Sequence, residues 1–355
     1  MEGGLFENTD NYKTIDNGEV EMKRILLISL AVFFAMTCGV QAAKKFPTRN
    51  ITNVVVWGAG GGTDTCNRII SAEMAPFLGV NVNVINKTGG VGGSVGMTYG
   101  FKQAHDGYTL TGLSESNVTA AVQGGWDQNF DVWDPFIVGG SPDLISVTAS
   151  APYKTLKDLV EAAKKDPGSI KAGASAAGSI HHLNLLALEK GSGAKFNFIP
   201  YKGSAPAQNA AMAGEVTVVV TSLAEQQQLL RGGKLRPLAM LIPDSFEVEG
   251  LGAIPSGFTD YPGLSEYLPI SQAIGFAIPH DVPAEAKAVL VDAFNKAIAT
   301  DKVKNWAKEN YYLLSGATGE ESRKIFSALQ SNFTWTLYEL GAAKVSPETL
   351  GIPKP

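Results

Sequence analysis

The apolar positions of the chain fall into short runs that are separated by stretches with helical spacing. Residues 54–57, 80–85 and 108–113 are rich in β-branched and apolar side chains, which is typical of buried strands. Helices are expected between them, over about 64–78 and from about 94 to 104. This alternation of strands and helices predicts an α/β fold with a parallel sheet covered on both faces.

The same alternation continues toward the C-terminus. Further strands are expected at 133–138, 145–149, 196–200, 216–220, 236–241 and 273–278. Further helices are expected at 156–165, 179–189, 205–212, 224–231, 284–300, 302–310 and 320–340. Thr155 is expected to cap the first of these helices, and a Gly/Pro-rich loop is expected at 254–264.

Two strand–helix units with glycine-rich starts lie far apart in the sequence, which predicts two lobes facing one another across a cleft. The long terminal helices are expected to return to the first lobe, so the chain should cross between lobes near 141–143 and near 270–273. The predicted first lobe is therefore residues 43–142 and 273–355, and the second is residues 143–272. Two lobes joined by two hinge strands form the arrangement of a hinged binding protein.

The N-terminal region has the pattern of an export signal. Lys23 and Arg24 precede an apolar stretch at 25–36 that is too short to span a bilayer, and Val40-Gln41-Ala42 is a small-residue cleavage box. We therefore interpret residues 22–42 as a signal peptide cleaved after Ala42, which predicts a periplasmic protein. Residues 1–21 are polar and patternless, and we interpret them as a non-native extension, with translation beginning at Met22.

The charge and cysteine content of the predicted mature chain narrow its function. Residues 1–42 hold three of the 29 Lys and Arg and six of the 34 Asp and Glu, so the remainder has a net charge near −2. This balance, without a basic cluster, argues against nucleic-acid binding. The mature chain has one cysteine, Cys66, which excludes an internal disulfide and is expected to be a small core residue. No cofactor is expected.

A glycine-rich turn follows the first predicted strand. Gly58 and Gly60–Gly62 allow a turn that side chains would block, and Thr63 or Asp64 is expected to cap the helix that follows. The free N–H groups of that helix, together with its dipole, form a site for a small anion. Arg68 is expected to pair with Asp64 at i,i+4, and Trp57 either stacks on a ligand or packs in the core.

A second glycine- and serine-rich turn spans residues 171–179. Ser175 and Ser179 offer hydroxyl groups there, and the turn offers free backbone N–H groups. We expect this turn to face the first one and to hold the other side of a ligand. His181 and His182 point about 100° apart on a helix, so they are not expected to share a metal; one packs and one faces the cleft.

The sequence contains partial matches to two enzyme motifs. A dinucleotide fingerprint lacks its third glycine, replaced by Thr63, and lacks an acidic residue after the second strand, which ends at Asn86. A serine hydrolase using Ser94, in a G-x-S-x-G pattern, or Ser175, with His182, stays open as an alternative. However, the residues before Ser94 are turn-like, and no Ser–His–carboxylate spacing is recognisable.

Several short motifs occur in a characteristic order. They are G-G-G-T-D at 60–64 with Arg68, N-K-T-G-G-V-G-G at 86–93, D-G-Y-T-L at 106–110, the 173–183 segment with Gly178, Ser179 and His182, Y-K-G at 201–203, A-G-E-V at 213–216 and G-K-L-R-P-L-A at 233–239. Together they resemble the solute receptors of tripartite tricarboxylate transporters, the Bug or TctC-like proteins, over nearly the whole mature chain.

This resemblance implies a type II periplasmic binding protein fold and a two-component membrane permease as partner. It also implies that the turns at 57–64 and 175–179 hold a carboxylate, largely through backbone N–H groups and ordered water. Family ligands include citrate, dicarboxylates, acidic amino acids and aromatic acids. The chain departs from the family pattern at Val56-Trp57, at Ala176 and at Thr217, and these departures touch the pocket or its edge.

The sequence therefore predicts a monomeric extracytoplasmic solute-binding protein that captures a small organic acid for a tripartite-type transporter. A sensory receptor for a signalling partner is the remaining alternative. Metal-binding and catalytic residues are not expected. The candidate ligand-binding residues are Trp57, Gly58, Gly61, Gly62, Thr63, Asp64, Ser114, Ser116, Asn117, Ser175, Ala176, Ala177, Gly178, Ser179, His182, Thr221 and Ser222.

Overall fold

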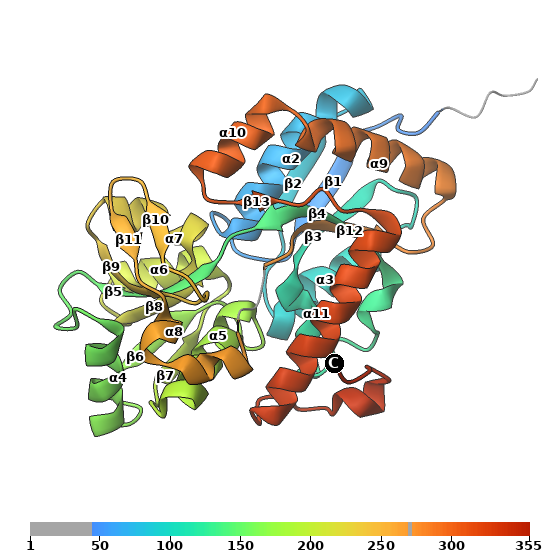
Figure 1. The fold of residues 1–355 in the computed structure, drawn as a ribbon. Helices are drawn as coiled ribbons and strands as arrows, with labels where there is room; N and C mark the ends of the chain where they lie inside the picture. Colours follow the sequence, from blue (N-terminus) through green and yellow to red (C-terminus); the bar gives the residue numbers. More distant parts are fainter. Residues whose placement is uncertain (1–44, 269–271) are drawn as a thin grey trace, which may run out of the picture. The chain divides into compact units, whose positions relative to one another are not determined.

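Two β-sheets, each covered by helices on both faces, organise the chain (Figure 1). The computed structural model describes residues 45–268 and 272–355, and residues 46–355 form one compact unit. The predicted extension at 1–21, the signal peptide at 22–42 and the cleavage after Ala42 lie outside the described residues. The two sheets give the α/β, two-lobed architecture that the sequence predicts.

The first lobe is built on a six-stranded sheet in the order β13-β4-β12-β3-β1-β2. Its strands are β1 (Ile51–Val55), β2 (Val82–Asn86), β3 (Thr109–Ser114), β4 (Trp133–Gly140), β12 (Ile274–Pro279) and β13 (Leu313–Leu314). β1 pairs in parallel with β2 and β3, as expected, whereas β12 is antiparallel to both β3 and β4. The sheet is therefore mixed rather than wholly parallel.

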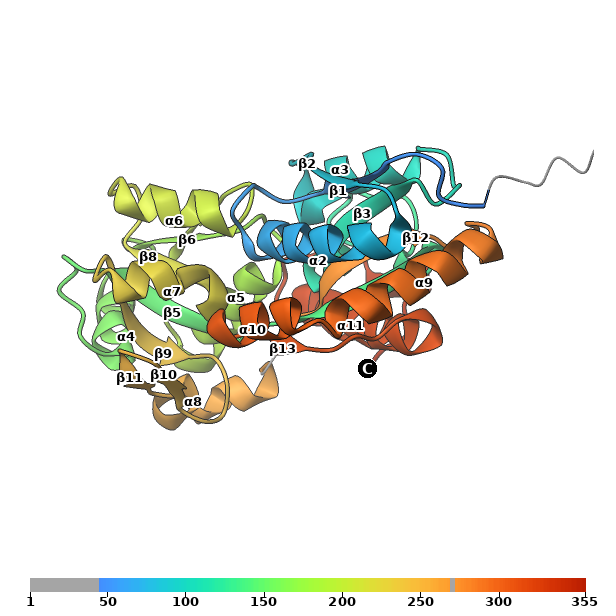
Figure 2. The ribbon, with the colours of Figure 1, turned by 90° about the horizontal axis from the view of Figure 1, so that it is seen from above.

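Helices pack on both faces of this sheet. They are α2 (Gly62–Leu78), α3 (Ser94–Phe101), α9 (Ala284–Ile298), α10 (Asp301–Glu309) and α11 (Gly319–Glu339). α2 and α9 run side by side, and their Met74 and Leu290 join Phe276 in one buried cluster (Figure 2). Met97 of α3 and Phe333 of α11 belong to a second cluster, with strand residues such as Val55 and Ile137. Burial of these apolar side chains holds the layers together.

The second lobe is built on a five-stranded sheet in the order β7-β6-β8-β5-β9. Its strands are β5 (Asp143–Thr148), β6 (Lys171–Ala174), β7 (Asn197–Pro200), β8 (Val218–Ser222) and β9 (Leu235–Met240). Its helices are α4 (Leu156–Lys165), α5 (Ile180–Ser192), α6 (Ser204–Met212), α7 (Leu223–Arg231) and α8 (Gly257–Asp260). α4 and α5 contribute to one buried cluster, and α6 and α7 contribute to another.

Some local expectations need correction. The predicted loop at 254–264 contains α8 and a 3-10 turn, because the Ser256 hydroxyl accepts a hydrogen bond from the Phe258 N–H and starts a short helix. The short hairpin strands β10 (Phe246–Val248) and β11 (Gly252–Ile254), like β13, were not predicted. The cap of α2 is Gly61 rather than Thr63 or Asp64, which both lie inside the helix. Thr155 caps α4 as predicted.

The chain passes from the first sheet to the second between β4 and β5, through Ser141 and Pro142. The Ser141 N–H donates to the Gln272 side-chain oxygen at 2.9 Å, so the segment that leads back toward β12 lies beside this link. The predicted lobe boundaries stay a prediction, because residues 269–271 lie outside the described part of the chain. The helices of residues 45–268 and 272–355 include none that is long and apolar enough to cross a membrane.

Candidate functional site

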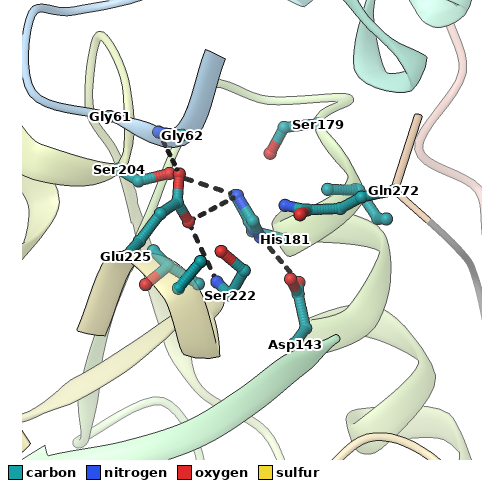
Figure 3. A network of polar contacts seen from close by, with 12 residues as sticks. Gly61, Gly62, Asp143, Ser179, His181, Ser204, Ser222, Glu225 and Gln272 are labelled. Carbon is teal, nitrogen blue, oxygen red and sulfur yellow. Dashed lines mark hydrogen bonds and ion pairs between the residues drawn. The ribbon is translucent and has the colours of Figure 1, made fainter. Parts of the chain in front are cut away.

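A cavity lies between the two lobes at the start of four helices. Helices α2, α5, α6 and α7 each contribute a lining residue from their first turn (Figure 3). The lining residues are Trp57, Gly61, Gly62, Thr63, Ser114, Glu115, Ser116, Ser175, His181, Gly203, Ser204, Glu225, Gln272 and Ile274. The cavity volume is about 20 Å³, which suffices for a water molecule. A larger ligand therefore requires a lining side chain to move.

The N-terminus of α2 holds a carboxylate in this cavity. The Gly62 N–H, in the first turn of the helix, donates to Glu225 Oε1 at 2.8 Å. A Cβ at Gly62 would lie 2.8 Å from that oxygen and 2.9 Å from the Tyr312 hydroxyl, so a side chain at residue 62 would obstruct the approach. The positive end of the helix dipole favours an anion at this place.

Glu225 comes from the other lobe and caps its own helix as well. Its Oε2 accepts a hydrogen bond from the Ser222 N–H at 2.9 Å, which is half of a capping box at the start of α7. The side chain is only 6% exposed. One buried carboxylate therefore joins the first turn of α2 in the first lobe to the first turn of α7 in the second.

His181 supplies a positive charge beside Glu225. Its Nδ1 lies 2.6 Å from Asp143 Oδ2, and its Nε2 lies 3.1 Å from Ser204 Oγ and 3.5 Å from Glu225 Oε2. Burial alone would lower the pKa of His181, but the charge and hydrogen bond of Asp143, with Glu225 and Glu115, raise it to about 9. At neutral pH this side chain is an imidazolium between two carboxylates.

The order Ser204–His181–Asp143 has the connectivity of a hydrolase triad. A triad histidine must be neutral to accept the serine proton, and a His181 pKa of about 9 leaves it protonated at neutral pH. Within residues 45–268 and 272–355, the hydrogen bonds join neither Ser94 nor Ser175 to a histidine. We therefore interpret the Ser204–His181–Asp143 arrangement as a structural charge network.

Glu115 is the third carboxyl group at the cavity. Its Oε2 accepts from the Ala273 N–H at 2.8 Å and its Oε1 from the Ser116 hydroxyl at 2.8 Å. The same Ser116 oxygen accepts the Ile180 N–H at 3.0 Å and thereby links the lobes. Burial raises the pKa of Glu115 to about 7, although these hydrogen bonds and His181 oppose the shift.

Asp64 does not contribute to the cavity lining, because its carboxylate is engaged within the first lobe. It accepts from the Gly60 N–H at 2.9 Å, from Asn86 Nδ2 at 2.8 Å and from Arg68, the predicted i,i+4 partner, at 2.9 Å. Burial would raise the pKa of Asp64, but these hydrogen bonds outweigh it and hold the pKa below the ordinary value. The carboxylate therefore rigidifies the glycine turn.

Both glycine-rich turns, at 57–64 and at 175–179, contribute some of their residues to the lining of the cavity. Of the candidates, Trp57, Gly61, Gly62, Thr63, Ser114, Ser116 and Ser175 line it. The Trp57 indole N–H donates to Ser114 Oγ at 3.2 Å. Ala176 and Ala177 line a neighbouring cavity of about 220 Å³ that also contacts Trp57. The second turn thus contributes to two adjoining spaces.

The other candidates are engaged in hydrogen bonds or helix caps beside the cavity. The Gly58 N–H donates to the Lys202 carbonyl, Asn117 donates to the Gly92 carbonyl, and the Gly178 carbonyl accepts from Thr119. Ser179 caps α5, Thr221 accepts from Gln208, and Ser222 is the N-cap residue of α7. Successive residues of a helix point about 100° apart, so His181 lines the cavity whereas His182 stacks on Phe198, with ring centroids 4.1 Å apart. Burial lowers the pKa of His182 to about 4.

Seven lining residues were absent from the sequence-based candidates. They are Glu115, His181, Gly203, Ser204, Glu225, Gln272 and Ile274. One local signal existed, the S-x-x-E capping box of Ser222 and Glu225, which places a carboxylate at the start of a helix. The others come together only through the tertiary fold. No cluster of His, Cys, Asp and Glu suited to a metal ion occurs in the part of the chain that the structure describes.

The fold and the cavity between its lobes define a periplasmic-binding-protein architecture. The sequence pattern of the tripartite tricarboxylate transporter family receptors matches residues 66–312. The chain belongs to this family of periplasmic solute-binding receptors.

Individual proteins support the assignment. BugT of Bordetella pertussis is 32% identical over 234 residues, which cover 63% of this chain and 71% of BugT. The periplasmic binding protein BugD has a TM-score of 0.76 at 25% identity, covering 84% of this chain and 99% of BugD. The R. palustris protein Rpa4515, whose structure was solved with adipate, gives the same TM-score of 0.76, identity of 25% and coverage of 84% and 99%.

Proposed function

We propose that this chain is an extracytoplasmic receptor that binds a small organic acid between its lobes and delivers it to a two-component membrane permease. The ligand is a di- or tricarboxylate, an acidic amino acid or an aromatic acid. The exported protein begins after Ala42 and acts as a monomer. N-terminal sequencing of the exported protein tests the first point, because a start well before Ala43 contradicts it.

One observation carries this proposal: a carboxylate is held on the N-terminus of α2 inside the interlobe cavity. Although that carboxylate belongs to Glu225, its partners are the Gly62 N–H and the imidazolium of His181, which suit any carboxylate. The adipate bound to Rpa4515, a protein 25% identical to this chain, supports an acid as ligand.

A thermal-shift screen of carboxylic acids against the purified protein tests this function. A ligand that binds the native state alone stabilises it by RT ln(1 + [L]/Kd), so the unfolding temperature rises with the logarithm of the ligand concentration once this exceeds the dissociation constant. We expect selective stabilisation by one class of acid, with the ligand recovered unchanged. Uniform responses across the panel, or turnover of a bound acid or ester, would contradict the receptor function.

We expect Trp57 to favour flat or partly apolar acids. Trp57 is 7% exposed and lines the cavity beside the α2 N-terminus. Trp57→Ala should weaken binding of an aromatic acid by roughly fivefold, because an aromatic stacking contact contributes about 1 kcal/mol. Aliphatic acids should lose less, and Trp57→Phe should retain most of the preference. Calorimetric titration measures the dissociation constants of an aromatic and an aliphatic acid. An equal change in the two constants on Trp57→Ala excludes this role.

We expect acid binding to weaken as the pH rises through about 7. Glu115, whose pKa is about 7, gains a negative charge at the cavity in this range. Repulsion between that charge and a ligand carboxylate should raise the dissociation constant roughly tenfold between pH 6 and 8, about 1.4 kcal/mol. Glu115→Gln should bind with nearly constant affinity over this range. An unchanged pH profile in the variant would exclude Glu115 as the cause.

A further inference from the structure

We propose that Glu225 is a tethered carboxylate that occupies the ligand's acid position, so that a ligand carboxylate binds there only by displacing it. This inference rests on the proposed function and assigns a specificity-determining residue within the same site. Figure 3 shows the Glu225 side chain between the first turn of α2 and the imidazole of His181.

The hydrogen-bond donors around Glu225 are groups that recognise a carboxylate. Its two oxygens accept from the Gly62 N–H at 2.8 Å and the Ser222 N–H at 2.9 Å, and His181 Nε2 lies 3.5 Å away. Two helix N-termini and one imidazolium are thus directed at a single carboxylate. These are the groups that an incoming acid would use, because helix N-termini and cations are the natural partners of anions.

The size of the cavity also requires displacement. The cavity of about 20 Å³ admits water but not an organic acid while the surrounding side chains keep their positions. Glu225 is the lining side chain that lies directly on the Gly62 N–H. Its withdrawal vacates a volume the size of a carboxylate at the donors that recognise one.

The charges at the cavity favour displacement as well. Glu225, Asp143 and Glu115 all contact or lie near His181, which is the cationic side chain among the cavity-lining residues of the described chain. A ligand carboxylate placed beside an undisplaced Glu225 would meet a like charge at low dielectric, which is strongly unfavourable. Exchange of one carboxylate for another keeps the local charge balance.

Displacement sets the affinity for acids. If the native protein holds Glu225 on Gly62 for most of the time, the apparent dissociation constant is the intrinsic value divided by the fraction in which the site is free. Removing the tethered carboxylate should therefore strengthen acid binding, which is the reverse of what is expected when a ligand-contacting residue is removed.

The experiment compares the wild-type protein with Glu225→Ala, Glu225→Gln and the control Glu161→Ala. Glu161 is a 58% exposed glutamate on α4 of the same lobe, so its removal makes the same change in net charge. The first probe is sodium acetate against sodium chloride at matched ionic strength, read as the unfolding temperature. The second probe is an organic acid from the screen, read as a dissociation constant by calorimetry.

Acetate should raise the unfolding temperature of Glu225→Ala by several degrees more than chloride does. In the wild type and in Glu161→Ala, the two salts should give the same unfolding temperature. The organic acid should bind Glu225→Ala at least tenfold more tightly than it binds the wild type. Glu225→Gln should fall between them, because its amide oxygen still accepts from Gly62 without the charge. Equal acetate effects in all proteins, or weaker acid binding by Glu225→Ala, would overturn the inference.

The two probes separate this inference from the proposed function. Acetate stabilisation of the Glu225 variants but not of the wild type or Glu161→Ala, with no organic acid bound by any of the proteins, supports the inference and contradicts the proposed ligand class. Equal binding of an organic acid by wild type and both Glu225 variants supports the function and contradicts the inference. If Glu225→Ala does not fold, the Glu225→Gln variant tests the inference by itself. Tighter acid binding than in the wild type supports displacement, and unchanged or weaker binding contradicts it.

Discussion

Replacement of His181 by alanine is expected to lower the free energy of unfolding by about 3–5 kcal/mol, the typical cost of breaking a buried ion pair by removing one partner. The imidazolium contacts Asp143 at 2.6 Å and Glu225 at 3.5 Å, and its side chain is 6% exposed. Its loss leaves two buried carboxylates without a counter-charge. Chemical denaturation at pH 7 measures the difference.

The effect should depend on pH in a defined direction. The pKa of His181 is about 9 in the folded protein and ordinarily 6.5, so its contribution to stability is complete below pH 6.5 and disappears as the pH rises through 9. The stability difference between wild type and His181→Ala should therefore narrow as the pH rises from about 6.5 to about 9. His182→Ala is the matched control: His182 is neutral at pH 7, with its pKa lowered to about 4, so its removal should show no such narrowing. A gap that stays constant from pH 7 to 10 would contradict a charged His181.

Replacement of Gly275 by alanine should destabilise the first lobe by about 4 kcal/mol or more, which is at the upper end for a point substitution. Gly275 lies in β12 between β3 and β4, and a Cβ there would lie 1.8 Å from the Phe136 carbonyl oxygen. Backbone atoms in the middle of a sheet cannot yield as a flexible side chain can. The shift would also disturb the Gly275 carbonyl, which accepts from Asn67 of α2 at 2.7 Å.

A glycine elsewhere provides the control for Gly275→Ala. Gly263 lies in a 3-10 turn, where a Cβ would lie 3.5 Å from the nearest atom, the Gly191 carbonyl oxygen, which is ordinary contact. Gly263→Ala should change the free energy of unfolding by less than about 1 kcal/mol. Comparable losses in the two variants would show that the crowding at Phe136 does not govern the effect.

Most helices and strands followed from the sequence because their signals are local. The helix expected at 156–165 has those ends in the structure, since Thr155 and Asp158 form a reciprocal cap. The insertion of β12 between β3 and β4 is different. Ile274 pairs with Ser114, which is 160 residues earlier in the chain, and with Gly139, which is 135 residues earlier. Nothing in the local pattern of residues 273–278 specifies which strands they pair with or in which direction.

The part of the site that is formed by backbone N–H groups was predictable from the sequence. The cluster of charged side chains was not. The glycine turn at Gly61 and Gly62 carries its own signal, because consecutive glycines before a helix expose N–H groups. Asp143, His181 and Glu225 come from β5, α5 and α7, so the distances between their side chains depend on the tertiary packing of the second lobe. Single residues of these types are common on any surface, and only their convergence makes them informative.

The neighbouring imidazoles of His181 and His182 do not titrate near neutral pH, where histidine ordinarily does. With pKa values of about 9 and about 4, one ring keeps its proton and the other lacks it from about pH 5 to 8. Neither ring therefore reports changes of acidity in the range where histidine ordinarily does. The group at this cavity that gains or loses a proton near pH 7 is instead a carboxylic acid, Glu115, so a glutamate determines how the charge of the cavity changes around neutral pH.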